Sequence, residues 1–211
     1  MRILAGFIFL LGMIFFSFYS YAQESSAQEL QAVLSPIQSL QADFVQTILD
    51  NKERVIQRSE GKLSLQRPGR FRWQVLRPIP QLIIANNTRL WIYDPDLEQV
   101  VIRPVAKEIG KTPAFILSND DTAISQDFIV RRLDAPQNWQ WFSLIPKSKA
   151  SLFQVIQLGF LNHHIKEMRL EDHLGHNTVI QFHHVKENIP IDAALFQFHA
   201  PVNVDVIDET R

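Results

Sequence analysis

The stretch GKLSLQRPGRFRWQVL (residues 61–76) decides the fold. Apolar and polar residues alternate on both sides of the Pro68-Gly69 turn signal, as they do in a β-hairpin that buries one face. The apolar positions of one parity are Leu63, Leu65, Phe71, Trp73 and Val75. Arg67 shares that parity and therefore points toward the apolar face, whereas Arg70 and Arg72 take the other parity and are expected to face solvent.

The sequence after this hairpin continues in the same manner. Short runs of alternating polarity follow one another at spacings of roughly 10–15 residues, separated by turn signals such as Asn86-Asn87. The runs are GKLSLQ, RFRWQVL, QLIIA, RLWIYD, QVVIR, DFIVRRL, WQWFSLI, FQVIQLGF, HIKEMRLED, TVIQFHHV and LFQF. About eleven strands joined by short turns predict a mainly β protein, an antiparallel meander that curls into a barrel or half-barrel.

Two segments favour short helices. An apolar stripe at i, i+3, i+4 and i+7 from Leu30 indicates an amphipathic helix, which Pro36 is expected to end. Residues 40–49 could extend this helix or begin the sheet, and their β-branched residues favour the sheet. Residues 111–121 lack alternation and have Pro113 where a second helix could begin. The two helices are expected to cover the concave face of the sheet.

The N-terminus has the pattern of a secretory signal peptide over residues 1–22. A short positive start precedes an apolar run, and Ser20 and Ala22 supply small residues for cleavage. The run is shorter than the roughly 20 residues that span a bilayer, although an uncleaved anchor is the alternative. Residues 23–211 are then expected to form a single domain. Because the chain has no cysteine, burial must stabilise it rather than disulfides, and it cannot be a lipoprotein itself.

The sequence offers little for catalysis. It contains no G-x-S-x-G motif, no Gly-rich phosphate loop and no H-E-x-x-H motif, and its paired carboxylates fall in turn-like stretches. The formal net charge is −1, without a basic or acidic block that would mark a nucleic-acid or membrane-surface site. We therefore expect no enzyme, no cofactor and no nucleic-acid partner.

Six of the seven histidines lie in one window, residues 163–184. If residues 173–176 are the tip of a hairpin, His163-His164 and His183-His184 lie close across it, and three histidines could bind a transition metal. Adjacent residues of a strand point to opposite faces, however, so each pair supplies at most one ligand per face. An exposed polar hairpin is the favoured interpretation, and no metal site is expected.

Aromatic residues are frequent in or beside the predicted strands. Two short helices can cover one face of a large sheet only partly, so a residual apolar cavity is expected beneath them. The residues nominated to line it are Phe44, Leu63, Leu65, Phe71, Trp73 and Trp91, and those nominated for the covering helices are Leu30, Leu34, Phe115 and Ile116.

Four segments together resemble the LolA family of periplasmic outer-membrane lipoprotein carriers. They are RPGRFRW (67–73), LWIYDPDLEQV (90–100), TPAFIL (112–117) and the C-terminal LFQFHAPVNVDVID. The resemblance runs from about Leu30 to Ile207, and it implies an incomplete antiparallel β-barrel with helices that form a lid over an apolar cavity. One departure is Asn203, where the family pattern commonly has glycine.

The resemblance also implies a function. Carriers of this family accept acylated lipoproteins from the inner-membrane ABC transporter LolCDE and shield their acyl chains in the periplasm. They deliver them to the outer-membrane acceptor LolB, which is anchored through an N-terminal cysteine that this chain lacks. The family's arginine at the place of Arg67 hydrogen-bonds the lid and helps to close it, so the resemblance makes Arg67 the lid latch. A monomer is expected.

Two other functions compete with the carrier. A half-barrel of this kind can serve as an envelope-stress sensor or regulatory lipid-binding domain, usually with an additional domain. The other is a periplasmic protein that binds metal through the histidine hairpin.

Overall fold

The structure, a computed structural model, describes residues 25–105, 113–118 and 121–210, so the predicted signal peptide (1–22) lies outside the described residues. Within them, twelve strands form one sheet in the order β12-β6-β5-β4-β3-β2-β1-β11-β10-β9-β8-β7. The strands are β1 (Ser39–Leu49), β2 (Val55–Gln66), β3 (Arg70–Arg77), β4 (Gln81–Ala85), β5 (Arg89–Asp94), β6 (Gln99–Pro104), β7 (Phe128–Leu133), β8 (Trp139–Pro146), β9 (Phe153–Leu161), β10 (His164–Asp172), β11 (Asn177–Glu187) and β12 (Asp205–Asp208).

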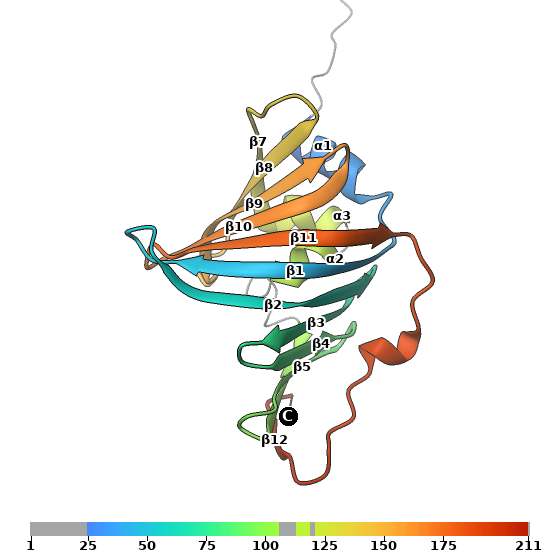
Figure 1. Ribbon diagram of the computed structural model, residues 1–211. Coiled ribbons are helices and arrows are strands. Elements are labelled where there is room, and N and C mark those ends of the chain that lie inside the picture. The colour runs from blue at the N-terminus through green and yellow to red at the C-terminus, as the bar shows by residue number, and fades with distance from the viewer. Residues whose placement is uncertain (1–24, 106–112, 119–120, 211) are drawn as a thin grey trace, which may run out of the picture.

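The sheet curls without closing on itself (Figure 1). Strands β1 to β6 form one antiparallel meander and β7 to β11 form another, and the two join where β1 pairs with β11. Strands β7 and β12 end the strand order on opposite sides and do not pair with each other. The predicted half-barrel is confirmed, with twelve strands rather than about eleven among the described residues.

Helix α1 (Ser26–Leu34) precedes the sheet and ends where the sequence predicted. It begins with a capping box, in which Ser25 Oγ accepts from the Gln28 N–H and the Gln28 side chain accepts from the Ser25 N–H. The chain then turns through Pro36 directly into β1, so residues 40–49 belong to the sheet, as their β-branched residues favoured. Helix α1 packs against β7 and α3, at the far end of the sheet from β12.

Helices α2 (Pro113–Ser118) and α3 (Asp121–Asp127) lie inside the curve of the sheet (Figure 1). Helix α2 begins at the predicted proline. Helix α3 was not predicted, because Ile124 is its only large apolar residue and gives no helical stripe. Among the described residues, no helix is long and apolar enough to span a bilayer.

The core occupies the concave side of the sheet. Inward-facing side chains of both meanders pack there with the buried side chains of the three helices, in one continuous apolar cluster. Its largest fully buried members are Phe44, Phe71, Phe115, Phe142 and Phe160. Because the helices supply part of this cluster, their removal would expose the middle of the core.

The C-terminal segment runs along the outside of the sheet and ends as β12, which pairs parallel with β6 (Figure 1). The predicted strand LFQF is wrong. Residues Ala193–Phe196 form a short 3-10 helix, η2, whose first turn is capped by Asp192 Oδ1 accepting from the Ala194 N–H. Helix η2 packs against β3, and Phe196 is buried although it does not belong to the concave core.

Arg70 and Arg72 lie on the convex face, as their parity predicted, yet both are half-buried rather than solvent-facing. The guanidinium carbon of Arg70 lies 5.9 Å from the centre of the Phe196 ring. Burial lowers the pKa of the Arg72 guanidinium. The sequence missed this because the segment that covers Arg70 comes from more than a hundred residues further along the chain.

Asn203, the departure from the family pattern, has φ +69°. That left-handed region favours glycine, and asparagine is among the few other residues that tolerate it. The substitution therefore keeps the backbone conformation that leads the chain into β12.

Gly61→Ala is expected to destabilise the fold by about 2–3 kcal/mol, because a Cβ there would lie 2.1 Å from the Gln74 carbonyl oxygen and 2.5 Å from Phe44 Cζ. Urea unfolding followed by tryptophan fluorescence measures the change. Ser64→Ala, on the opposite face of the same strand, is the matched control and should cost less than about 1 kcal/mol. Equal losses for the two variants would contradict the close contact between Phe44 and β2.

Candidate functional site

The concave face under the helices has an aromatic floor. The Phe44 ring of β1 reaches across Gly61 of β2 and stacks on the Trp73 ring of β3, with centroids 3.9 Å apart. Phe71 of β3 makes an edge-to-face contact with Phe115 of α2, with centroids 5.0 Å apart. Five of the six nominated cavity residues, Phe44, Leu63, Leu65, Phe71 and Trp73, thus lie together in this floor and are buried.

The sixth nominated residue, Trp91, does not lie there. It pairs with Ile84 of β4, and Ile84 pairs with Arg72 of β3, so Trp91 takes the convex parity. The inward positions of β5 belong to Leu90 and Ile92 instead. The placement of Trp91 in the cavity was wrong because RLWIYD has apolar residues at both parities, which leaves its inward face undefined by the sequence.

Helices α1 and α2, which we call the lid, close over this floor. The four residues nominated for them, Leu30, Leu34, Phe115 and Ile116, are all at most 3% exposed. The lid in this structure is therefore closed, and its apolar side chains occupy the space that the floor encloses.

Arg67 lies between the floor and the end of α1. Its Nη1 donates to the carbonyl oxygen of Leu34, the last residue of α1, at 2.9 Å. The Leu34 carbonyl also accepts from the Ile37 N–H at 3.0 Å, so the guanidinium is its second donor. The positive charge complements the negative end of the helix dipole. The Arg67 backbone N–H donates to the Gln38 carbonyl in the linker after α1.

The same turn also contacts the end of α2, and the sequence did not predict this contact. The Gly69 N–H donates to the carbonyl oxygen of Ser118, the last residue of α2, at 2.7 Å. Gly69 has φ +72°, a conformation that glycine adopts without strain. The Pro68-Gly69 signal was visible, but nothing in the sequence indicates that this turn would meet a second helix.

Asn188 is a further polar contact that sequence reasoning missed. Its side chain accepts from the Gln38 N–H and donates to the Pro36 carbonyl, and its backbone N–H donates to the Ser39 carbonyl. These bonds join the end of β11 to the linker between α1 and β1. They fix the position from which α1 extends over the floor.

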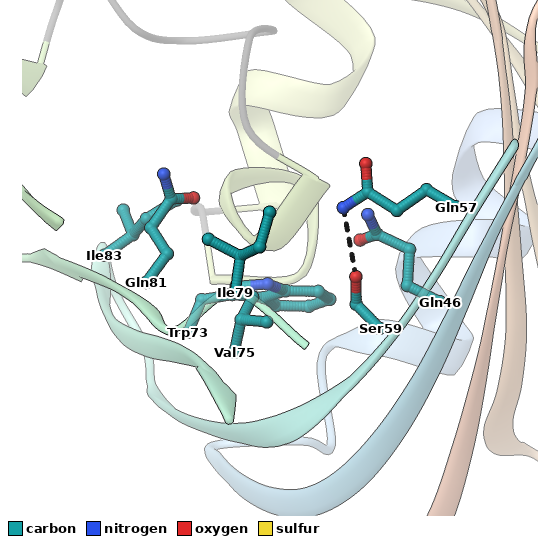
Figure 2. Close-up of a pocket in the computed structure, with 8 residues that line it drawn as sticks. All are labelled: Gln46, Gln57, Ser59, Trp73, Val75, Ile79, Gln81 and Ile83. Carbon is teal, nitrogen blue, oxygen red and sulfur yellow. Dashed lines mark hydrogen bonds between the residues drawn. The ribbon is translucent and has the colours of Figure 1, made fainter. Parts of the chain in front are cut away.

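A pocket of about 240 Å³ opens beside the aromatic floor (Figure 2). In Figure 2 the Trp73 ring, Val75 and Ile79 form one side, and the side chains of Gln46, Gln57 and Ser59 lie opposite them. The remaining lining residues, Gln81 and Ile83, come from β4. The inward face of β1 and β2 thus changes from apolar under the lid to polar at this opening.

The size and polarity of the pocket indicate what it could hold. A volume of about 240 Å³ is below the roughly 300–1,000 Å³ of typical ligand sites, so a large ligand would have to displace the lid. The lining combines four apolar side chains with three glutamines and a serine, which suits a molecule with an apolar chain and a polar end. Among the described residues that line the pocket, none carries an acidic or basic side chain.

Three of the hairpin histidines each hydrogen-bond to a separate carboxylate. Their ring Nδ1 atoms lie 2.9, 2.8 and 2.9 Å from carboxylate oxygens in the pairs His164–Glu187, His176–Asp172 and His184–Asp43. Among the described residues, no three His, Cys, Asp or Glu side chains are placed to hold a metal ion. Hydrogen bonds from Lys62 and then His184 hold the pKa of Asp43 below its usual value.

Most of the chain matches one protein-family model. Residues 35–199 match the model of the outer membrane lipoprotein carrier protein LolA. The chain belongs to the LolA family. The matched residues run from the end of α1 past η2, and they include both meanders, α2 and Arg67.

Curated outer-membrane lipoprotein carrier proteins resemble most of the chain. An outer-membrane lipoprotein carrier protein of Legionella pneumophila is 40% identical over 96% of this chain and 98% of its own. The carrier protein of Pseudomonas aeruginosa is 40% identical over 90% and 91%. That of Chromohalobacter salexigens is 38% identical over 89% of both chains.

Solved structures share the fold at low sequence identity. An uncharacterised conserved protein from Thermus thermophilus has a TM-score of 0.55 at 16% identity, and the match covers 87% of this chain and 99% of that one. A LolA superfamily protein from Nitrosomonas europaea has a TM-score of 0.50 at 12% identity, covering 83% and 99%. These likenesses concern the LolA fold alone.

Val75→Glu is expected to weaken binding of a fluorescent palmitate analogue at least about tenfold, because the carboxylate would bring a charge to the apolar side of the pocket beside Trp73. Fluorescence titration of the purified protein measures the dissociation constant. Gln74→Glu adds the same charge to the adjacent residue, which faces the convex side, and should bind like the parent. Equal weakening of binding in both variants would show that the pocket is not the binding site.

Proposed function

We propose that this protein carries acylated lipoproteins across the periplasm with their acyl chains held against the aromatic floor. The single observation that carries the proposal is an apolar interior closed by short helices that are held through polar contacts at their ends. Membership of the LolA family and the carrier names of its relatives support the same function.

The physical need for such a carrier is large. Burial of one methylene is worth about 0.8 kcal/mol, so a chain of about fifteen methylenes leaves a membrane at a cost of order 12 kcal/mol. An apolar cavity removes most of that cost during transport. The three glutamines that line the pocket would then face the polar end of the lipid, where it joins the protein cargo.

A carrier must also release its cargo. The lid residues Leu34 and Phe115 fill the space that an acyl chain would occupy, so lid closure competes with cargo binding. The free energy of closure subtracts from cargo affinity by mass action between the closed and open states. Arg67 contributes to closure through its hydrogen bond to α1, which makes it the proposed latch.

The partners follow from the family function. We propose that the protein accepts cargo from the inner-membrane ABC transporter LolCDE and passes it to the outer-membrane acceptor LolB. In this proposal it acts as a periplasmic monomer without catalysis, and residues 23–211 form its single domain after removal of the signal peptide.

Release of radiolabelled lipoprotein from spheroplasts tests the carrier function. Purified protein without residues 1–22 should collect the labelled lipoprotein as a soluble complex in the supernatant. If the label stays in the membrane pellet while a known LolA family carrier releases it in parallel, the proposed function is wrong.

Arg67→Leu is expected to accept cargo but to pass it to outer-membrane vesicles carrying LolB at least about tenfold more slowly. Loss of a charged hydrogen bond of about 1.5–3 kcal/mol weakens lid closure, and about 1.4 kcal/mol corresponds to a tenfold change in affinity. Transfer of the labelled lipoprotein between isolated complex and vesicles measures the rate.

Two control variants accompany this prediction. Arg58→Leu removes an exposed arginine from β2 and should transfer like the parent. Arg67→Lys keeps the charge but loses the planar donor group, and it should lie between the parent and Arg67→Leu. Normal delivery by Arg67→Leu would show that Arg67 does not contribute to lid closure.

A further inference from the structure

A second arginine takes an inward position on the other half of the sheet. On β7, Phe128 and Val130 face the interior, and Arg132 follows them at the same parity. Its partner in the adjacent strand is Phe142 of β8, which is completely buried. Arg132 therefore repeats, on the edge strand of the second meander, the pattern that marks Arg67 in the first.

Arg132 contacts both the sheet and the lid. Its guanidinium carbon lies 4.9 Å from the centre of the Phe142 ring, a cation–π geometry that orients the side chain. Its Nη1 lies 3.5 Å from Oε2 of Glu29, which belongs to the first turn of α1. A carboxylate in the first turn also complements the positive end of the helix dipole.

Helix α1 is thus held at both ends by arginines from different meanders. Arg67, in the turn between β2 and β3, binds the carbonyl of Leu34 at the C-terminus of the helix. Arg132, on β7, binds Glu29 at the N-terminus. The helix bridges the two halves of a sheet that does not close on itself, and it cannot leave the floor while both contacts persist.

We propose that Glu29 and Arg132 form a second clamp on α1, a pair of positioning residues that sets how firmly the empty carrier closes. The importance of the clamp for cargo release rests on the proposed carrier function, whereas its effect on α1 does not. The clamp differs chemically from Arg67 because its acceptor is a carboxylate, so both partners are charged and salt screens their attraction.

The exposure of the pair suits a contact that must break repeatedly. About a third of each side chain is accessible, 33% for Arg132 and 36% for Glu29. A fully buried pair would leave a desolvated charge behind when the lid opens, at a large cost. At partial exposure water can hydrate both groups after separation, so the clamp resists opening by a small, reversible amount.

Hydrogen–deuterium exchange of the α1 amides in the empty protein tests the clamp. Glu29→Gln and Arg132→Gln should each increase the exchange rate about two- to fivefold at low salt, the range expected for a partly exposed ion pair. The double variant should exchange no faster than the singles. The charge exchange Glu29→Arg with Arg132→Glu should restore only part of the protection, because it loses the dipole interaction of Glu29 and the cation–π contact of Arg132. The increase should disappear in 1 M NaCl.

Arg131→Gln is the matched control, since Arg131 precedes Arg132 on β7 and faces the convex side. It should leave α1 exchange unchanged, and all variants should unfold at similar urea concentrations. Unchanged α1 exchange in Arg132→Gln, in an experiment where Arg67→Leu accelerates it, would overturn the clamp. Additive effects of the two single variants would overturn it as well, because they would show that Glu29 and Arg132 act separately.

The transfer assay separates this inference from the carrier function. Arg132→Gln should deliver lipoprotein about two- to fivefold more slowly than the parent, and Arg131→Gln should deliver normally. If the parent protein collects no lipoprotein but the Glu29 and Arg132 variants still change α1 exchange, the proposed function is wrong and the clamp is supported. If the parent collects and delivers cargo but Arg132→Gln leaves α1 exchange unchanged, only the clamp proposal is wrong.

Discussion

A sheet that curls without closing has a concave apolar face that the sheet itself cannot cover, and the rest of this structure depends on that constraint. The strand order ends at β7 and β12, which do not pair. Helices α1 and α2 cover the face with the side chains of Leu34 and Phe115. Because they are short and hydrogen bonds from one turn hold their ends, they can cover the face without being permanent parts of it.

One turn connects this cover to the sheet. Arg67 donates to the end of α1, and Gly69, two residues later, donates to the end of α2. Both helices therefore end against the hairpin whose strands carry Leu63, Leu65 and Trp73 in the floor. The turn of the hairpin thus also binds the ends of both lid helices, so a shift of this turn would move α1 and α2 together.

The sequence predicted most of the floor because β1 to β3 bury one face and keep their alternation. Strands β4 and β5 do not show this alternation, because they bury residues on both faces. Ile84 is buried on the convex face, and Ala85 and Leu90 are buried on the concave one. Trp91 was misplaced for this reason. Arg132 carried the same parity signal as Arg67 within DFIVRRL, but its partner Glu29 lies a hundred residues away, which alternation alone cannot reveal.

In the proposed carrier, closure of the lid must be strong enough to protect the floor and weak enough to yield to an acyl chain. A lid held only by apolar burial would have a closing energy set by its area, and cargo would replace that area with similar burial. Polar contacts at the helix ends, such as that of Arg67 with Leu34, act differently because an acyl chain offers no donor or acceptor to replace them. In the proposed carrier they would favour the empty, closed state over the loaded one, so that the apolar floor could bind a lipid chain and still release it.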